Sequence, residues 1–444
     1  MKVGFVSLGC SKNLVDTEMC IGLFKKNDYI IESNPQFADI IVINTCGFIE
    51  PAKEEAINTI LEMAEYKKTG KCKFLIVMGC LVQRYKKELE KALPEVDLFL
   101  SIDDYENIWD KVSNLVKKIE NNEKSGSYLS NTLDYNDRIV STGDTTAYLK
   151  IAEGCSNRCT YCAIPYIRGP FVSRKMEDIL EEANMLANQG IKEIIVIAQD
   201  TTKYGVDIYG KPMLAKLLDE LAKIKGFKWI RFLYAYPESI TDELIDVVKN
   251  NKKICKYFDI PLQHYSDSVL KRMNRKSDSK SIERVINKIR EKIPNVVLRT
   301  TLIVGFPGET REDFFKLYEF VNDTKFEKLG VFTYSKEDGT PAAKIKEQVH
   351  YKTKNYRYRM IMDLARQISK IKLEEKIGNI YEVIVDGYSD DGKYLCTRSY
   401  MDIPNEDGTV FIKCKDRHIK EGSFIKCKIT AVKDYDMIGE IIEE

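Results

Sequence analysis

Three cysteines lie within eight residues of one another near the middle of the chain. Residues 154–162 read GCSNRCTYC, which places Cys155, Cys159 and Cys162 in a C-x3-C-x2-C array. A closed zinc site uses four ligands and disulfides use cysteines in pairs, so neither accounts for three. Because thiolates bind zinc and iron–sulfur clusters alike, the array predicts a metal centre with one open position. A zinc loop completed by a distant residue and a chance grouping are the alternatives.

The composition is that of an ordinary globular protein. The chain has 444 residues with 44% hydrophobic and 31% charged side chains, enough for roughly two to four domains. With a net charge of +1, any preference for nucleic acid must come from local asymmetry. The start of the chain lacks the features of a signal peptide, and no apolar run reaches the length of a membrane span. We therefore expect a cytoplasmic protein without a membrane partner, whose twelve cysteines are metal ligands, redox groups or core residues.

The pattern of apolar runs predicts an α/β protein in three parts. Residues 1–117 alternate short β-branched runs such as VGFVSLG and DIIVINT with helical stretches, which predicts an open parallel α/β sheet. Residues 118–140 are polar and are expected to form a linker. Residues 141–372 contain six further strand–helix units and are expected to form a partial (β/α)6 barrel. Residues 373–441 have short strands between glycine turns, which predicts a small antiparallel β-barrel.

A second set of three cysteines lies in the first part of the chain. Cys10, Cys46 and Cys80 each follow an apolar strand and adjoin a glycine, in SLGCSKN, INTCGFI and VMGCLVQ. Because the carboxyl ends of parallel strands meet at one edge of a sheet, these thiols are expected to converge. Taken singly, each is better explained as a buried core cysteine. Their shared setting and odd number instead favour a second iron–sulfur cluster.

The C-x3-C-x2-C array resembles the signature of the radical S-adenosylmethionine (SAM) enzymes, in which an aromatic residue precedes the last cysteine. Here that residue is Tyr161. The resemblance implies that Cys155, Cys159 and Cys162 hold a 4Fe-4S cluster whose open iron binds the amino and carboxylate groups of SAM. In such enzymes the cofactor carries the difficult chemistry, while the protein positions it and excludes water.

Two further strand ends resemble the SAM-binding segments of these enzymes. The run TLIVGFPGET ends a strand with Gly305, Gly308 and Glu309, where the superfamily packs a glycine motif near the adenine, and glycines allow close approach to a ligand. Gln199 and Asp200 end an earlier strand, where the superfamily binds the methionine part of SAM. The common Gly-Gly-Glu is absent there.

The whole chain resembles the radical SAM methylthiotransferases, which join an N-terminal three-cysteine domain, a radical SAM core and a C-terminal TRAM barrel. The stretches LGCSKNLVDTE, NTCGFIEPAKEE, EGCSNRCTYCAIPYIRG, IAQDTTKYG and DIPLQH are similar to the branch that modifies an aspartate of ribosomal protein number twelve of the small subunit. The tRNA-modifying branch usually has Gln-Met-Asn after its first cysteine, where this chain has Ser11, Lys12 and Asn13.

The resemblance also implies a reaction with two 4Fe-4S clusters and two SAM molecules per turnover. The cluster on Cys10, Cys46 and Cys80 would carry a sulfur atom, which one SAM methylates. Cleavage of the second SAM would give a radical that removes hydrogen from the aspartate β-carbon, which then takes the methylthio group. The scheme needs an electron donor and no side-chain acid or base, so we assign no histidine a catalytic role.

Local charge bears on the substrate. Residues 376–444 carry 10 basic and 14 acidic side chains, a net charge of −4, whereas an RNA-binding surface should be basic. An acidic barrel suits a basic ribosomal protein. The preceding segment contains Lys352, Lys354, Arg357 and Arg359, which indicates a contact with ribosomal RNA or simply a solvated helix face. The alternative functions are a tRNA adenosine methylthiotransferase, an iron–sulfur electron carrier or scaffold, and an RNA-binding zinc protein.

Overall fold

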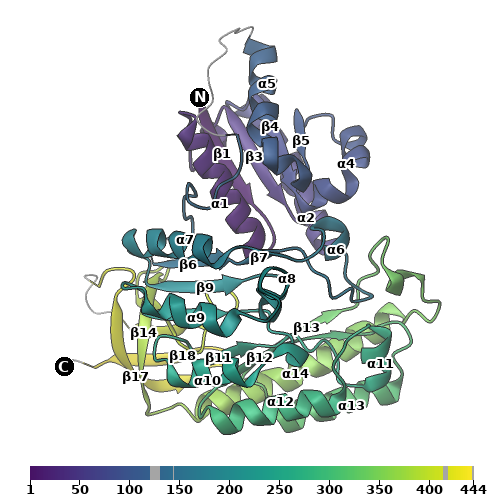
Figure 1. The fold of residues 1–444 in the computed structure, drawn as a ribbon, viewed down its shortest axis with the longest axis vertical. Coiled ribbons are helices and arrows are strands. Elements are labelled where there is room, and N and C mark those ends of the chain that lie inside the picture. The colour runs from purple at the N-terminus through teal and green to yellow at the C-terminus, as the bar shows by residue number, and fades with distance from the viewer. Residues whose placement is uncertain (121–130, 144, 414–418, 443–444) are drawn as a thin grey trace.

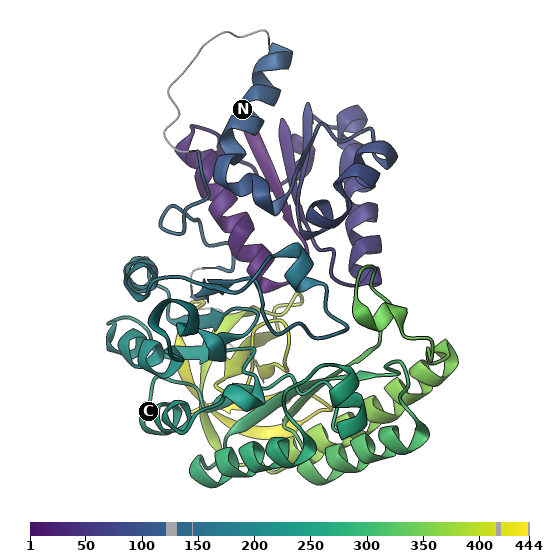
Figure 2. The ribbon, with the colours of Figure 1, turned by 45° about the vertical axis from the view of Figure 1, so that its right-hand side comes forward.

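The computed structural model stacks an N-terminal α/β unit on a larger α/β core, and a β-barrel packs against the core (Figures 1 and 2). The structure describes residues 1–120, 131–143, 145–413 and 419–442. Within these ranges, no helix has both the length and the apolar character needed to cross a membrane.

The N-terminal unit is an open parallel sheet with helices on both faces, as predicted. Its strands are β1 (Lys2–Ser7), β2 (Ile30–Ile31), β3 (Ile40–Thr45), β4 (Phe74–Gly79) and β5 (Leu98–Leu100). Its helices are α1 (Ser11–Lys26), α2 (Glu50–Ala64), α3 (Tyr66–Thr69), α4 (Cys80–Ala92) and α5 (Ile108–Glu120), with short 3-10 helices η1 (Pro35–Phe37) and η2 (Ile102–Asn107). The strand order is β2-β1-β3-β4-β5. Ile41 and Ile43 of β3 pack with α2 and α4, and Ile40 and Val42 pack on the opposite face with α1 and α5.

The core is a partial barrel of parallel strands, as predicted. Its strands are β6 (Thr146–Lys150), β9 (Glu193–Ile197), β10 (Trp229–Phe232), β11 (Tyr257–Asp259), β12 (Val297–Val304) and β13 (Lys328–Thr333). Strands β6, β9 and β10 form one sheet and β11, β12 and β13 form another. An isolated parallel bridge pairs Ile230 of β10 with Ile254, which precedes β11. A small hairpin of β7 (Ala152–Glu153) and β8 (Val172–Ser173) lies beyond β6.

Most helices of the core cover the outer face of these strands, and the inner face receives the barrel. The helices are α6 (Ile164–Ile167), α7 (Met176–Asn188), α8 (Val206–Tyr209), α9 (Leu214–Lys223), α10 (Asp242–Asn250), α11 (Asp267–Arg272), α12 (Ser279–Lys292), α13 (Arg311–Thr324) and α14 (Tyr351–Glu374), with 3-10 helices η3 (Thr201–Lys203), η4 (Pro237–Ser239) and η5 (Pro341–Lys344). Tyr148, Trp229 and Tyr257 of the core strands share one buried cluster with barrel residues and with Val15 and Met19 of α1.

The C-terminal unit is a closed barrel, but it is not wholly antiparallel. Its strands are β14 (Ile380–Tyr388), β15 (Tyr394–Ser399), β16 (Val410–Lys413), β17 (Phe424–Val432) and β18 (Met437–Ile441), closed in the order β14-β15-β16-β18-β17. The β16–β18 pair is parallel and the other four pairs are antiparallel. This corrects the predicted all-antiparallel barrel, because a closed ring of five strands cannot alternate in direction throughout.

The segment after α5 fastens α1 to the core. Part of the predicted linker 118–140, residues 121–130, lies outside the described residues. Beyond it, the buried Arg138 pairs with Glu182 of α7 at 2.8 Å and lies 3.7 Å from Glu18 of α1. The same guanidinium donates to the Tyr148 carbonyl at 2.6 Å. One arginine therefore joins α1, α7 and β6.

Candidate functional site

The structure gathers Cys155, Cys159 and Cys162, here named the core trio, in the loop between β7 and α6. Cys155 and Cys159 are buried and Cys162 is half-buried. Burial raises the pKa of the Cys162 thiol, and the neighbouring thiols of Cys159 and Cys155 raise it further. Thr160 of this loop donates its backbone N–H to the Met273 carbonyl at 3.0 Å. The loop is therefore fixed against the end of α11.

Cys10, Cys46 and Cys80, the N-terminal trio, lie at one edge of the N-terminal sheet, after β1, β3 and β4. Gly9 has φ +86°, and a Cβ built there would lie 2.6 Å from the Cys46 Cβ and 3.1 Å from its Sγ, so these two loops touch. Burial raises the pKa of Cys80 to about 12, with Cys10 and Cys46 adding to the shift. The strand ends thus bring together three thiols that are far apart in sequence.

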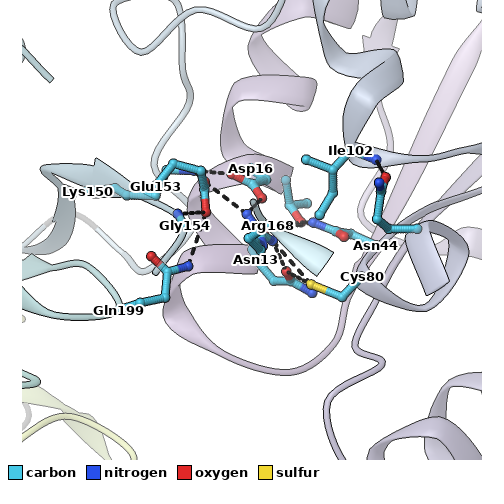
Figure 3. A network of polar contacts seen from close by, with 12 residues as sticks. Asn13, Asp16, Asn44, Cys80, Ile102, Lys150, Glu153, Gly154, Arg168 and Gln199 are labelled. Atoms are coloured by element: carbon cyan, nitrogen blue, oxygen red, sulfur yellow. Dashed lines mark hydrogen bonds and ion pairs between the residues drawn. The ribbon is translucent and has the colours of Figure 1, made fainter. Parts of the chain in front are cut away.

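The segment that directly follows the core trio contacts the N-terminal trio. Cys80 forms a buried cluster with Ala163, which directly follows Cys162, and with Ile167 of α6. Arg168, at the end of α6, reaches across to the N-terminal unit (Figure 3). Its Nη2 donates to the Cys80 Sγ at 3.4 Å. The segment that carries the core trio therefore touches a member of the N-terminal trio.

A buried network of charges holds this junction. The Arg168 guanidinium pairs with Asp16 of α1 at 2.8 Å and with Glu153 of β7 at 3.0 Å, and it donates to the Asn13 Oδ1 at 2.5 Å. Lys150 supplies a second buried cation, paired with Asp16 and with Glu153, the latter at 2.9 Å. Burial alone would raise the pKa of Glu153, but Lys150 and Arg168 lower it well below its usual value. The Glu153 carboxylate is therefore held charged between two cations.

Two predicted SAM-binding residues lie beside the core trio. Gln199 donates its side-chain amide to Glu153 at 3.1 Å, and its buried Oε1 has no partner among the described residues. Asp200 is buried and accepts from Asn157 at 2.8 Å, and Lys203 lies 3.9 Å away. Burial raises the pKa of Cys155. The charge of Asp200 raises it further, and the charge of Lys203 lowers it. Polar groups of both signs therefore flank the core trio.

Tyr161 faces an arginine that sequence reasoning did not identify. Arg275 is buried with its Nη1 3.9 Å from the Cys159 Sγ, and its guanidinium lies 4.2 Å from the centroid of the Tyr236 ring. Burial raises the pKa of Tyr161, and Arg275 opposes that shift. The arginine thus places a positive charge next to the core trio.

The predicted glycine turn is closed by α14. Gly305 has φ +72°, and a Cβ there would lie 2.3 Å from the Cγ of Lys354. The Glu309 carboxylate accepts from the Phe306 backbone N–H and from Arg357, both at 2.9 Å, and burial raises its pKa to about 7. Gly308 donates its N–H to the Glu347 carbonyl at 2.7 Å. The Glu309 side chain thus fastens the turn, and the glycines let backbone and helix meet.

Lys12 is a buried cation that sequence reasoning left without a role. It is 7% exposed, and its ammonium lies 3.4 Å from the centroid of the Tyr234 ring of the core. Burial opposes its charge, but Tyr234 and Cys10 raise its pKa above the usual value. The available sequence signal was a lysine two residues after a strand-end cysteine.

Family comparisons cover nearly the same three parts. Residues 149–321 match the Radical SAM superfamily, residues 2–101 match Uncharacterized protein family UPF0004, and residues 377–442 match the TRAM domain. A curated relative from Alkaliphilus oremlandii, "Ribosomal protein uS12 methylthiotransferase RimO", is 62% identical over 444 residues and covers 100% of both chains. The chain belongs to the uS12 methylthiotransferase family. Relatives of the same name from Acetivibrio thermocellus and Clostridium botulinum are 49% and 52% identical, each covering 100% of this chain and 99% of the relative.

Solved structures similar to this uS12 methylthiotransferase family member support the fold. The radical SAM methyltransferase TsrM from Kitasatospora setae, solved with cobalamin and a [4Fe-4S] cluster, matches with a TM-score of 0.55 and 12% identity, covering 77% of this chain and 76% of that chain. The cobalamin-dependent radical SAM enzyme OxsB matches with a TM-score of 0.51 and 14% identity, covering 82% and 56%. At such identities the likeness concerns the fold alone.

Membership of the Radical SAM superfamily implies a 4Fe-4S cluster and SAM, and the core loop fits them. All three of its cysteines are free thiols, and three thiolates leave one iron of a four-iron cluster without a protein ligand. The buried Oε1 of Gln199 and Nε of Arg275 have no hydrogen-bond partner in the part of the chain that the structure describes. In that same part, no three Cys, His, Asp or Glu side chains form a group suited to a single metal ion.

Proposed function

We propose that this chain adds a methylthio group to the β-carbon of an aspartate in ribosomal protein uS12, using two 4Fe-4S clusters and two SAM molecules per turnover. The observation that carries the proposal is the junction of the two trios, where Arg168 and Ala163 touch Cys80. A reaction that needs both trios requires them to share one site. The substrate follows from the names of the full-length relatives.

The cysteines divide into two ligand sets in this proposal. The core trio holds one cluster and the N-terminal trio holds the other, and each set leaves one iron for a small molecule. The chemistry that these cofactors supply when bound is homolytic removal of hydrogen from an unactivated C–H bond and delivery of a methylthio group. The N-terminal trio fits its cluster because Gly9 keeps the space beside Cys46 free of a Cβ.

The surrounding side chains position the reactants and exclude water. Asp16, Glu153, Lys150 and Arg168 are proposed to fix the distance between the two trios, since buried ion pairs are costly to open. A pocket for SAM beside the core trio is proposed on the residues predicted above. These are Tyr161, Gln199, Asp200, Gly305, Gly308 and Glu309. No side chain is assigned as a catalytic acid or base.

Product analysis of the anaerobically reconstituted enzyme tests the proposal. The enzyme is incubated with SAM, a reductant and either purified uS12 or unmodified tRNA, and the products are mapped by mass spectrometry. We expect a methylthio group on one aspartate of uS12 and none on tRNA. Modification of a tRNA adenosine would instead support the tRNA-modifying alternative. An iron content equivalent to one cluster per chain would contradict the two-cluster scheme.

The further partners in this proposal are a one-electron donor and ribosomal RNA, with the reaction in the cytoplasm where uS12 is assembled. The basic residues of α14 divide between two faces. Lys354 donates to the Tyr334 carbonyl at 2.8 Å and Arg357 pairs with Glu309, so both have structural roles. Lys352 and Arg359 are exposed, two helical turns apart, and Tyr356 between them is 63% exposed. Cations interleaved with exposed aromatic rings suit single-stranded RNA.

The RNA contact has its own test. The double variant Lys352→Glu/Arg359→Glu should modify free uS12 at the normal rate and assembled small subunits more slowly, because charge reversal repels phosphates. Equal rates on both substrates would leave α14 as a solvated helix.

A further inference from the structure

Lys12 is a buried cation that makes no ion pair with a carboxylate of the described residues. Only 7% of the residue is exposed, and no carboxylate of the described residues lies within 4.0 Å of its Nζ. Burying a cation without a paired anion is unfavourable. The Tyr234 ring, 3.4 Å away, compensates only in part, because a cation–π contact is weaker than a buried ion pair. A carboxylate from a bound molecule would complete this contact.

The carboxylate nearest in electrostatic effect is paired with an arginine and not with Lys12. Glu406, from the loop between β15 and β16, is the only carboxyl group that acts on the Lys12 charge appreciably among the described residues. Its Oε2 pairs with Arg299 at 2.6 Å, and Arg299 also pairs with Asp259 at 3.0 Å. Among the described residues, Lys12 therefore makes no direct ion pair with a carboxylate, and its contact is the Tyr234 ring.

Tyr234, whose ring contacts Lys12, has an unusual backbone conformation. Tyr234 has φ +61°, a left-handed conformation that non-glycine residues rarely adopt. Its N–H donates to the Asp259 carboxylate at 2.9 Å, and its carbonyl accepts from the Thr201 N–H at 3.1 Å. Backbone strain that neighbouring strands enforce in this way occurs mostly at functional sites. The backbone that carries this ring is thus held in place at the carboxyl ends of the core strands.

We infer that Lys12 binds the carboxylate of the aspartate that the enzyme modifies. This inference rests on the proposed function and adds the residue that recognises the substrate. Lys12 lies two residues from Cys10 of the N-terminal trio and faces the core. In an aspartate the carboxylate is bonded directly to the β-carbon, so a cation here holds the reacting carbon beside the junction of the two trios. In a buried setting, a charged pair of this kind confers strong selectivity.

SAM also carries a carboxylate, and the structure distinguishes the two sources. The core trio has a cation of its own, because Lys203 acts on Cys155 and hydrogen-bonds Asn157. Lys12 instead lies over the Tyr234 ring, two residues from Cys10 of the N-terminal trio. The cation next to the core trio is thus available to SAM, and Lys12 is left for the substrate.

Binding of two matched peptides tests the inference. The reconstituted full-length enzyme is titrated, by fluorescence anisotropy, with a labelled peptide of the target uS12 loop and with the same peptide carrying Asn in place of the target Asp. We expect the Asp peptide to bind about 30-fold more tightly or better, as for a desolvated charge pair. Lys12→Met should bind both peptides within about twofold of each other. Lys12→Arg should restore part of the difference, because it restores the charge.

The matched control is Lys25→Met, at the exposed end of the same helix, which should discriminate like the unchanged enzyme. A merely structural Lys12 predicts a lower melting temperature for Lys12→Met. We expect an unchanged or higher one, because replacing an unpaired buried cation with an apolar side chain removes a desolvation cost.

Three results would overturn the inference. They are persistent discrimination by Lys12→Met, absence of discrimination by the unchanged enzyme, and a weakened affinity for SAM with intact Asp/Asn discrimination, which would assign Lys12 to SAM. Failure of the proposed function looks different, because the unchanged enzyme would then not methylthiolate uS12 at all.

Discussion

The two cysteine trios reach similar arrangements by opposite routes. The core trio lies within eight residues of one loop, whereas the N-terminal trio comes from three strand ends spread over 71 residues of sequence, from Cys10 to Cys80. The first is set by local chain geometry and the second by the register of a parallel sheet. A local motif can be recognised without a fold, but its use here depends on a second site that only the sheet creates. Four predictions test this contrast, from the largest expected effect to the smallest.

Removal of a ligand cysteine should have the largest effect and should separate the two trios. Cys159→Ala is expected to abolish both methylthiolation and release of deoxyadenosine from SAM, because the core cluster loses a ligand. Cys46→Ala should abolish methylthiolation and keep deoxyadenosine release. Both variants should lose about half of the iron. Chromatography of the SAM products together with an iron assay measures this, and methylthiolation by Cys46→Ala would remove Cys46 from the ligand set.

Removal of Arg168, which joins the segment of the core trio to Cys80, should have the second-largest effect. Arg168→Met leaves Asp16 and Glu153 with Lys150 as their remaining cation at the junction. Removing one partner of a buried ion pair typically costs about 3–5 kcal/mol, so the free energy of unfolding in denaturant should fall by that order. The control is Arg284→Met on the exposed face of α12, expected to change it by less than ~0.5 kcal/mol. Equal stabilities of the two variants would show that the junction does not depend on Arg168.

Substitutions at two glycines test how tightly the backbone packs beside each trio. In Gly9→Ala, the new Cβ meets Cys46 at 2.6 Å, whereas in Gly169→Ala, between α6 and β8, nothing lies within 4 Å. Both residues have positive φ, which costs an alanine about 1–2 kcal/mol. We expect Gly9→Ala to destabilise the fold by more than that cost and to lose iron from the N-terminal trio. Gly169→Ala should retain all iron. Thermal denaturation with an iron assay measures both, and full iron in Gly9→Ala would contradict the close contact.

Removal of iron should produce the smallest difference between the trios. Residues 155–159 have no regular secondary structure, whereas Cys10 directly precedes α1 and Cys80 begins α4. After anaerobic chelation, amide hydrogen exchange should therefore increase several-fold more in the core loop than at the N-terminal trio. Mass spectrometry of the exchanged peptides measures this. An equal increase at both would mean that the sheet does not stabilise its own trio.

Much of the fold could be predicted because apolar periodicity records which faces are buried. The β-branched runs ending at Ser7, Thr45 and Gly79 mark strands β1, β3 and β4, and buried strands of this kind pair in parallel. The barrel was predicted, but its parallel β16–β18 pair was not. Strand patterns in sequence carry no information on the order in which a ring closes.

The residues of the candidate site also divide into those that the sequence identifies and those that it does not. The six cysteines could be found from spacing and from strand ends. Arg168, Lys150 and Lys12 could not be assigned roles, because lysine and arginine are mostly exposed and carry no sequence mark when they are buried. Their partners lie far along the chain, as with Lys150 and Asp16, which are 134 residues apart.

The sequence by itself determined the two sets of thiols, the βα alternation and the family to which the chain belongs, because these follow from spacing along the backbone. Only the tertiary structure decided that the segment after the core trio contacts Cys80, that this contact is made through Arg168 and that Lys12 is buried over Tyr234. The physical reason is that such contacts are set by packing of one unit against another, where burial turns ordinary surface charges into strong and directional interactions.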